Sequence, residues 1–172
     1  MNKISLVTTT INVPTFLEGI LKKYNKNNKK FKFEILIIGD KKTPRSVKSY
    51  ITKLKKKYIK HIFYYDIKSQ DNFFKKKYNK IYKLFPYNDA IRKLLGSLYI
   101  LDKKEIKSDK IIFIDDDNYV NDKINFLKDF DIVGSNYNGK LISNKKGWPN
   151  LYKSFIEKQN IPLFPRGFPW SH

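Results

Sequence analysis

The chain has 172 residues, which fits one domain, and it contains no cysteine, which excludes disulfide scaffolds, thiolate metal sites and cysteine nucleophiles. Its formal net charge is +20, from 36 Lys and Arg residues against 16 Asp and Glu. Its apolar runs are too short for a membrane-spanning helix or a signal-peptide core, so we expect a cytoplasmic protein with no membrane span.

The first part of the chain alternates between strand and helix patterns. β-branched and alternating apolar runs indicate strands, and apolar residues at helical spacing indicate helices. The expected elements are a strand at 4–10, a helix at 15–25, a strand at 31–39, a helix opened by Thr43-Pro44, and a strand at 61–66.

The pattern continues up to an acidic motif. A helical stripe covers 74–85, and Asn88 or Asp89 can cap a further helix. The expected inner face of that helix is Ile91, Leu94, Leu95 and Leu98. Gly96 in its middle indicates close packing against a neighbour. The strongest strand, at 110–114, leads directly into Asp115-Asp116-Asp117.

After the acidic motif we expect a short helix at 121–129, an apolar stretch at 132–133, a hairpin at 138–139 and a proline-rich tail. Strands separated by helices predict an α/β fold, with a mainly parallel sheet and helices on both faces. We expect a single domain over 1–172, in which 1–130 form the core and 131–172 form the hairpin and the tail.

The high charge has two interpretations. All but three of the basic residues are lysines, and a coding bias toward Lys, Asn, Ile, Tyr and Phe explains much of this excess without a partner. A dedicated nucleic-acid reader is expected to use arginine for bidentate contacts. Lysine-driven nucleic-acid binding therefore remains an alternative function rather than the leading one.

The acidic motif predicts a metal site. Adjacent carboxylates repel one another, and a divalent cation offsets that repulsion. Oxygen-only ligands favour Mg²⁺ or Mn²⁺, which bind one or two carboxylates together with substrate phosphate. Asp115 and Asp117 are the candidate ligands, and an acidic turn that caps the next helix is the alternative.

Other polar residues follow the expected strand ends, where parallel sheets bind ligands. The hydroxyls and backbone of Thr8, Thr9 and Thr10, together with Asp40, could contact a nucleobase and ribose. The planar guanidinium groups of Arg92 and Arg166 could bind phosphate. For Arg45, a chance occurrence or a salt bridge is the preferred interpretation.

Six ordered segments resemble the STELLO-type glycosyltransferases and, more distantly, the reversibly glycosylated polypeptides. Both families belong with the GT-A nucleotide-sugar enzymes. They are Thr8-Thr-Thr-Ile-Asn-Val-Pro14, Ile38-Gly-Asp-Lys-Lys-Thr-Pro44, Pro86-Tyr-Asn-Asp-Ala-Ile-Arg-Lys-Leu-Leu-Gly96, Ile112-Phe-Ile-Asp-Asp-Asp-Asn118, Trp148-Pro-Asn-Leu-Tyr152 and Pro165-Arg-Gly-Phe-Pro169. The resemblance implies a GT-A (Rossmann-like) fold and transfer of a sugar from a nucleoside-diphosphate sugar to an unknown acceptor, with Mn²⁺ or Mg²⁺.

By this resemblance, 1–130 form the nucleotide-binding core and 131–172 the acceptor side. Asp115 and Asp117 of the DxD motif would hold the metal or the ribose. The donor-binding residues would be Thr8, Thr9, Thr10, Ile11, Asp40, Lys41, Arg92, Asp116 and Arg166. The chain stops where family members continue, so we expect it to be truncated after the donor-binding half, and we assign no catalytic base.

Two further functions remain open at this level. One is a non-catalytic remnant or partner subunit that binds a nucleotide sugar. The other is a haloacid-dehalogenase-type phosphatase with Asp115 as nucleophile. Tyr119 stands where that family places a threonine, which disfavours the phosphatase.

Overall fold

A computed structural model describes residues 2–27, 31–59, 61–103 and 108–120 of the chain. All of them fall within the first of two compact units, residues 1–133. The expected helix at 121–129, the hairpin, the proline-rich tail, Arg166 and the boundary at 130/131 lie outside the described residues.

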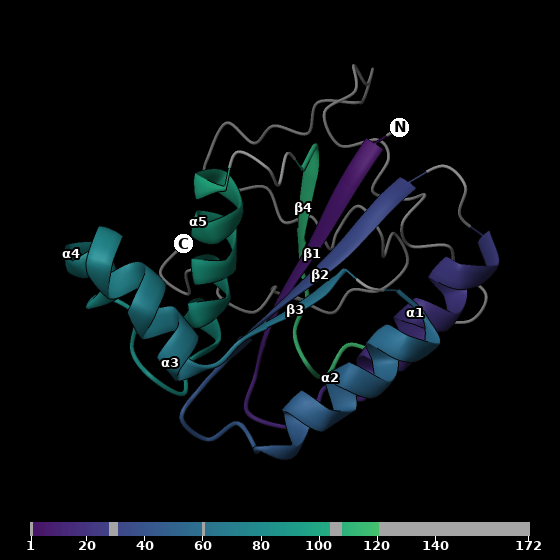
Figure 1. Cartoon of the computed structure of the whole chain (residues 1–172), viewed down its shortest axis with the longest axis horizontal. Coiled ribbons are helices and arrows are strands. Elements are labelled where there is room, and N and C mark those ends of the chain that lie inside the picture. Colours follow the sequence, from purple (N-terminus) through teal and green to yellow (C-terminus); the bar gives the residue numbers. More distant parts are fainter. Residues whose placement is uncertain (1, 28–30, 60, 104–107, 121–172) are drawn as a thin grey trace, which may run out of the picture. The chain divides into compact units, whose positions relative to one another are not determined.

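Four parallel strands form the described sheet (Figure 1). They are β1 (Asn2–Thr10), β2 (Phe31–Gly39), β3 (Ile62–Tyr65) and β4 (Lys110–Phe113), in the order β3-β2-β1-β4. All four strands expected from the sequence are confirmed close to their expected bounds. Because every pairing is parallel, the carboxyl ends of all four strands meet at one edge of the sheet.

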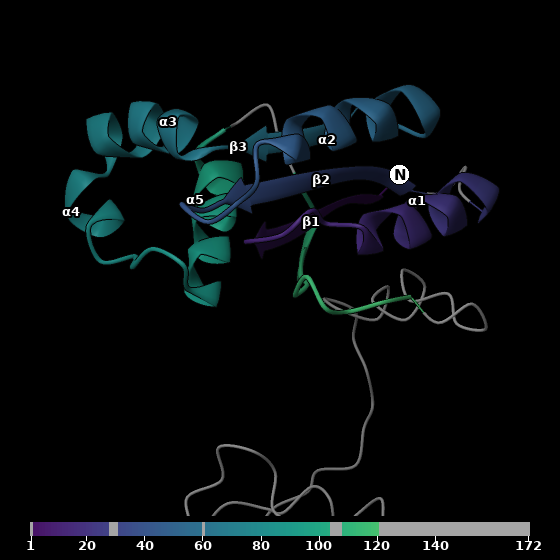
Figure 2. The ribbon, with the colours of Figure 1, turned by 90° about the horizontal axis from the view of Figure 1, so that it is seen from below.

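Two amphipathic helices, α1 (Phe16–Asn27) and α2 (Ser46–Lys57), cover one face of the sheet (Figures 1 and 2). Alternate strand residues point to this face and pack against apolar helix residues. The buried cluster comprises Ile4, Leu6, Phe16, Leu17, Ile20, Leu21, Phe33, Ile35, Ile37, Val47, Ile51, Leu54, Ile62 and Ile112. Helices therefore fix β1 and β2 in place from this side.

The opposite face is covered by shorter helical pieces. They are α3 (Ile67–Gln70), a π-helical turn η1 (Asp71–Lys75), α4 (Asn79–Tyr82), a 3₁₀ turn η2 (Ala90–Lys93) and α5 (Leu94–Asp102). Both faces of the sheet are thus covered by helices, as the sequence pattern predicts (Figure 2). The described fold is an α/β fold with an all-parallel sheet, compatible with a Rossmann-like architecture.

Two details of this face correct the sequence prediction. The stripe at 74–85 is not one helix, because the backbone leaves helical geometry at Tyr78 (φ −132°, ψ 37°). Ile91 and Leu94 are exposed rather than inward-facing, because the 3₁₀ turn η2 changes the helical phase ahead of α5. Leu95 is fully buried as predicted, and Asp89 caps η2 by accepting the Ile91 N–H at 2.8 Å.

Gly96 is the point where α5 comes closest to the sheet. A Cβ atom at this position would collide with Cγ1 of Val7 in β1, which confirms the close packing expected from the sequence.

We expect Gly96→Ala to lower the free energy of unfolding by about 2 kcal/mol through overpacking. Gly19→Ala in α1 is the matched control, since nothing lies within 4 Å of its added methyl group. It should stabilise the fold by about 0.5–1 kcal/mol. Urea unfolding checks both, and a stable Gly96→Ala variant would contradict the packing.

No helix in the described part of the chain combines the length and apolar character needed to cross a bilayer.

Candidate functional site

A pocket of about 270 Å³ lies at the carboxyl edge of the sheet, where β1, β2 and β4 end. Its lining comprises Thr9, Thr10, Ile11, Asp40, Asn88, Asp89, Ala90, Asp115, Asp116 and Asp117. Seven of these residues were predicted as site residues from three separate positions in the sequence. The volume is close to the lower end of the range of about 300–1,000 Å³ typical of small-molecule sites.

Hydrogen bonds of Thr43 join the ends of β1 and β2 beneath this pocket. The Thr43 hydroxyl donates to the carbonyl oxygen of Thr10 at 2.5 Å and accepts the Asp40 N–H at 2.6 Å. On the β4 side, the Thr10 hydroxyl lies 2.9 Å from Oδ2 of Asp116. The three strand ends are therefore held in fixed relative positions by short side chains.

Asp40 is the most enclosed acid of the pocket, with its side chain only 1% exposed. Oδ1 accepts the N–H of Lys41 and Oδ2 accepts the N–H of Asn88, each at 2.7 Å. Oδ2 also lies 3.6 Å from Nε of Arg92. The two backbone donors thus fix the orientation of this carboxylate, and the buried guanidinium balances its charge without a hydrogen bond to it.

Arg92 occupies a different place from the one its predicted role requires. Its side chain is fully buried and does not line the pocket, so it touches no phosphate in this arrangement. Its guanidinium donates to the carbonyl oxygens of Phe85 (3.0 Å) and Pro86 (3.4 Å) and to Oε1 of Gln70. The geometry makes Arg92 a positioning residue for Asp40.

The partners of Arg92 form a buried polar cluster that the sequence analysis did not include. Gln70 donates through Nε2 to the carbonyl oxygens of Gly39 (2.6 Å) and Tyr65 (2.8 Å). Burial raises the pKa of Tyr82, which therefore stays protonated and donates to Asp71 at 3.0 Å. No local signal in the sequence marks Gln70, because its partners Gly39, Tyr65 and Arg92 belong to β2, β3 and η2.

Asn88 is a further pocket residue whose role sequence reasoning missed, since it was considered only as a helix cap. It has a positive φ of 56°, which asparagine tolerates better than most side chains. In this conformation its N–H reaches Asp40, and its Oδ1 accepts the Lys42 N–H at 3.2 Å. The turn after Pro86 is thereby attached to the turn after β2.

The acidic motif lines the pocket with three carboxylates in different environments. Asp115 is paired with the ammonium group of Lys93, and Oδ1 of Asp117 accepts from Nδ2 of Asn118 at 3.1 Å. Asp116 is the half-buried member and faces Thr10. The motif therefore has side chains on one pocket wall, and Lys93 is the cation nearest to it.

These residues supply donors that suit a hard divalent cation. Mg²⁺ commonly uses only one or two protein carboxylates and completes its shell with water and phosphate oxygens, so Asp115 and Asp117 would suffice. Within the described ranges, no group of three or more His, Cys, Asp or Glu side chains is arranged to hold a metal on its own. A cation at this wall would therefore depend on oxygens from the ligand.

Two further predicted residues, Thr8 and Lys41, fall outside the pocket. Thr8 is buried and its hydroxyl lies 3.2 Å from the carbonyl oxygen of Thr9. Lys41 lines a second, neighbouring cavity, and its ammonium group lies 3.8 Å from the ring centroid of Tyr87. The pocket therefore brings together the β1 edge, Asp40 and the acidic motif, but neither Thr8 nor Lys41.

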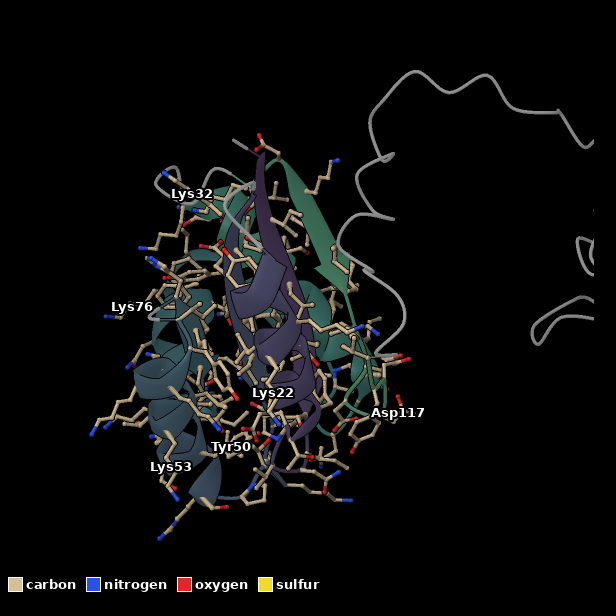
Figure 3. The ribbon with its side chains drawn as sticks, turned by 90° about the vertical axis from the view of Figure 1, so that its right-hand side faces the viewer. Lys22, Lys32, Tyr50, Lys53, Lys76 and Asp117 are labelled. Carbon is tan, nitrogen blue, oxygen red and sulfur yellow. The ribbon has the colours of Figure 1, made fainter. Side chains whose placement is uncertain are left out.

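Many lysines project from the outer surfaces of the elements. Figure 3 shows Lys22, Lys53 and Lys76 extending away from the sheet, on α1, α2 and the segment after η1, and all three are exposed. Several other lysines pair with acids, as Lys57 does with Glu18 at 2.9 Å. Lys22, Lys53 and Lys76 fit the interpretation of a solvated, composition-driven surface.

Asp66 gives the described unit a pH-dependent ion pair. Although partial burial opposes it, hydrogen bonds from Lys48 (2.6 Å) and Ser69 lower the pKa of Asp66 to about 2. A carboxyl whose pKa is depressed on folding contributes stability above its unfolded pKa and loses that contribution as the pH falls. Asp66→Asn keeps a good N-cap for α3 but removes the charge.

We therefore expect Asp66→Asn to cost up to about 2 kcal/mol at pH 7. The difference from the unsubstituted protein should shrink below about pH 4 and vanish near pH 2. Urea unfolding at several pH values measures it. A difference that stays constant down to pH 2 would show that the charge of Asp66 is not responsible.

No protein-family model matches the chain, and a search among curated proteins finds no match. The fold and the pocket together define an α/β protein with a polar, partly acidic site at the carboxyl edge of its parallel sheet. The function must therefore be argued from the chemistry of that site.

Proposed function

We propose that the chain is a metal-dependent glycosyltransferase of GT-A type, which transfers a sugar from a nucleoside-diphosphate sugar to an acceptor. The observation that carries this proposal is the convergence of Thr10, Asp40 and the acidic motif on one pocket. These residues come from three of the six segments that resemble STELLO-type enzymes. The position of the pocket, beyond the carboxyl ends of parallel strands, is typical of nucleotide sites.

The pocket offers separate groups for the two halves of a donor. The Thr9–Ile11 edge and Asp40 lie at one wall and would contact the nucleoside, with Asp40 held in place by Arg92. Asp115 and Asp117 lie at the other wall and would hold Mn²⁺ or Mg²⁺, which supplies positive charge next to the diphosphate. Asp116, which accepts a hydrogen bond from Thr10, would hold the two walls in a fixed relative position.

Lys93 is better placed than Arg92 for the phosphate-binding role predicted for Arg92. Lys93 does not itself line the pocket, but it is paired with Asp115, which does, and its side chain is 22% exposed. When an acceptor hydroxyl attacks the anomeric carbon, the new C–O bond forms as the bond from that carbon to the diphosphate breaks. The diphosphate leaves with the electron pair, and the proton of the hydroxyl passes to water. A cation at this wall would stabilise the charge that develops on the leaving group.

A panel of uridine, guanosine, adenosine and cytidine diphosphate sugars, each with Mn²⁺, tests the proposal by urea unfolding of the full chain. A ligand at a hundred times its dissociation constant should add about 2.7 kcal/mol to the free energy of unfolding. Release of the nucleoside diphosphate then distinguishes an enzyme from a subunit that only binds the donor. The proposal fails if no member of the panel stabilises the protein.

A further inference from the structure

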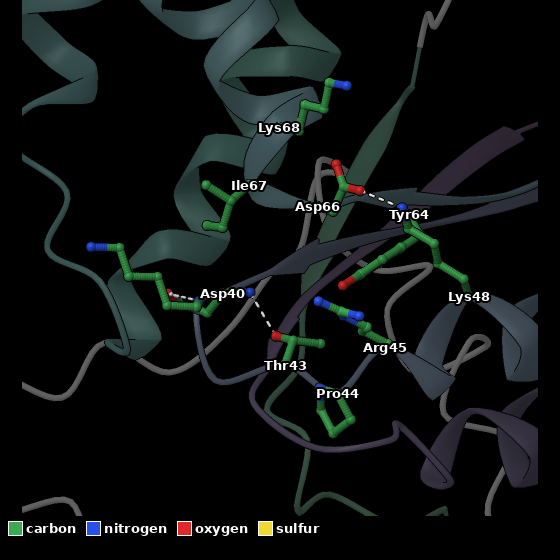
Figure 4. A pocket seen from close by; sticks show the side chains of 10 residues that line it. Asp40, Thr43, Pro44, Arg45, Lys48, Tyr64, Asp66, Ile67 and Lys68 are labelled. Carbon is green, nitrogen blue, oxygen red and sulfur yellow. Dashed lines mark hydrogen bonds and ion pairs between the residues drawn. The ribbon is translucent and has the colours of Figure 1, made fainter.

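A second cavity, of about 640 Å³, lies beside the candidate donor pocket at the ends of β2 and β3 (Figure 4). Four of its ten lining residues are cations: Lys41, Arg45, Lys48 and Lys68. Tyr64 of β3, Ile67 of α3 and Pro44 provide apolar surface, and the volume lies within the range of small-molecule sites. Apart from Asp40, this cavity shares no lining residue with the donor pocket.

The two acids of the cavity do not neutralise all of its cations. Asp66 is engaged by Lys48 and Ser69. Asp40 is engaged by two backbone N–H groups and by Arg92. Within the described part of the chain, no acid is paired with the side chains of Lys41, Arg45 and Lys68, so three of the four cations at the cavity are not neutralised.

The first turn of α2 adds to this unbalanced positive charge. Helix N-termini carry partial positive charge and are stabilised by nearby anions. Here the first turn of α2 contains no acidic residue, no side chain caps it, and Arg45 and Lys48 stand at its start. Basic residues are unfavourable at this end of a helix, so an anion in the cavity would relieve repulsion that the protein itself leaves uncompensated.

We infer that this cavity binds a phosphate-bearing small molecule, with the phosphate between Arg45 and Lys68 and the organic part against Tyr64 and Ile67. In Figure 4 the Arg45 guanidinium lies next to Tyr64, and Lys68 extends from α3 beyond Asp66 with its ammonium group directed away from Arg45. The flexible side chain of Lys68 would turn toward the cavity to reach the same phosphate. Phosphate fits two cations better than a carboxylate does, because a phosphate monoester carries a charge of about −1.5 to −2 and three acceptor oxygens. The guanidinium can bind it through paired hydrogen bonds, while lysine supplies a point charge. The inference does not depend on sugar transfer.

The test uses the full chain without metal or nucleotide sugar, with inorganic phosphate and ribose 5-phosphate as probes at physiological ionic strength. This salt concentration screens exposed charges beyond about 8 Å, which suppresses general attraction to a +20 protein. Amide chemical shifts report the location of binding. The expected shifts are at Tyr64, Ile67 and Lys68, with little change at Thr10 and Asp117.

Arg45→Gln/Lys68→Gln is the test variant, and Lys53→Gln/Lys76→Gln is its control, with the same loss of charge on exposed surfaces elsewhere. We expect the test variant to bind ribose 5-phosphate about tenfold or more weakly, because hydrogen bonds between charged groups are lost. The control should change affinity by less than about twofold. Tighter binding of the ester than of inorganic phosphate supports a site for the organic part, and equal binding supports a site for the phosphate group alone.

Two results would overturn the inference. One is an equal loss of affinity in both variants, which would mean that the probes respond only to overall charge. The other is the absence of shifts at the cavity with either probe. Since neither probe involves the acidic motif, failure here leaves the proposed transferase untouched, and failure of the nucleotide-sugar panel leaves this inference untouched.

Discussion

Replacing Arg92 with methionine is expected to lower the free energy of unfolding by about 3–5 kcal/mol, the usual cost of removing one partner from a buried charge pair. Methionine retains the length of the side chain but removes the charge opposite Asp40, which is 1% exposed. It also leaves Oε1 of Gln70 and the carbonyl oxygen of Phe85 without their donor. Chemical unfolding measures the effect.

Arg45→Met is the control for this prediction, because Arg45 is exposed and has no acidic partner within the described residues. Its effect should stay within about 0.5 kcal/mol. Adding Asp40→Asn to Arg92→Met should recover part of the loss, since the unpaired buried charge is then gone. If Arg92→Met does not fold, Arg92→Lys is compared with and without Asp40→Asn instead. This comparison measures the coupling free energy between positions 92 and 40. A loss below about 1 kcal/mol would contradict the buried-pair account.

Asp115→Asn/Asp117→Asn is expected to abolish the stabilisation that Mn²⁺ and a nucleotide sugar give together, which is about 2.7 kcal/mol at a hundred times the dissociation constant. The amides keep the shape of the carboxylates but lack the negative charge that attracts a divalent cation. Without ligand, the double variant should be as stable as the unsubstituted protein, because surface ion pairs such as Lys93–Asp115 contribute little.

The matched control for this pair is Asp71→Asn/Asp102→Asn. Like Asp115, these acids pair with lysines: Asp71 with Lys75 and Asp102 with Lys77. Each of them accepts a hydrogen bond from a tyrosine, and neither lines the pocket. The control lowers the negative charge equally, so the gain in stability on ligand binding should be unchanged. An equal loss of ligand stabilisation in both double variants would point to general electrostatics instead of a metal site.

Local patterns in the sequence predict the sheet well, because each strand carries its own signal. β1 and β2 alternate between two buried faces, and the short β4 is an apolar run that leads straight into the acidic motif. Since parallel strands end at a common edge, the meeting of Asp40 with the acidic motif follows from the topology alone. This part of the candidate site is therefore predictable from the sequence.

The environment of Arg92 could not be predicted in the same way. The scarcity of arginine indicates that its planar group is needed, but not whether it faces a ligand or the protein. Its burial depends on Gln70, twenty-two residues earlier, and on carbonyl oxygens of Phe85 and Pro86. The break at Tyr78, which the helical stripe concealed, separates η1 from α4 ahead of this cluster.

The most direct test of the site is paramagnetic broadening of amide signals by Mn²⁺ in the presence of a stabilising nucleoside-diphosphate sugar. We predict that the signals of Thr10, Asn88 and Asp117 broaden first, at Mn²⁺ well below the protein concentration, while those of Asp71 and Asp102 stay sharp. If no signal broadens, or if all five signals broaden equally, the result would contradict a metal-assisted donor site at this edge of the sheet.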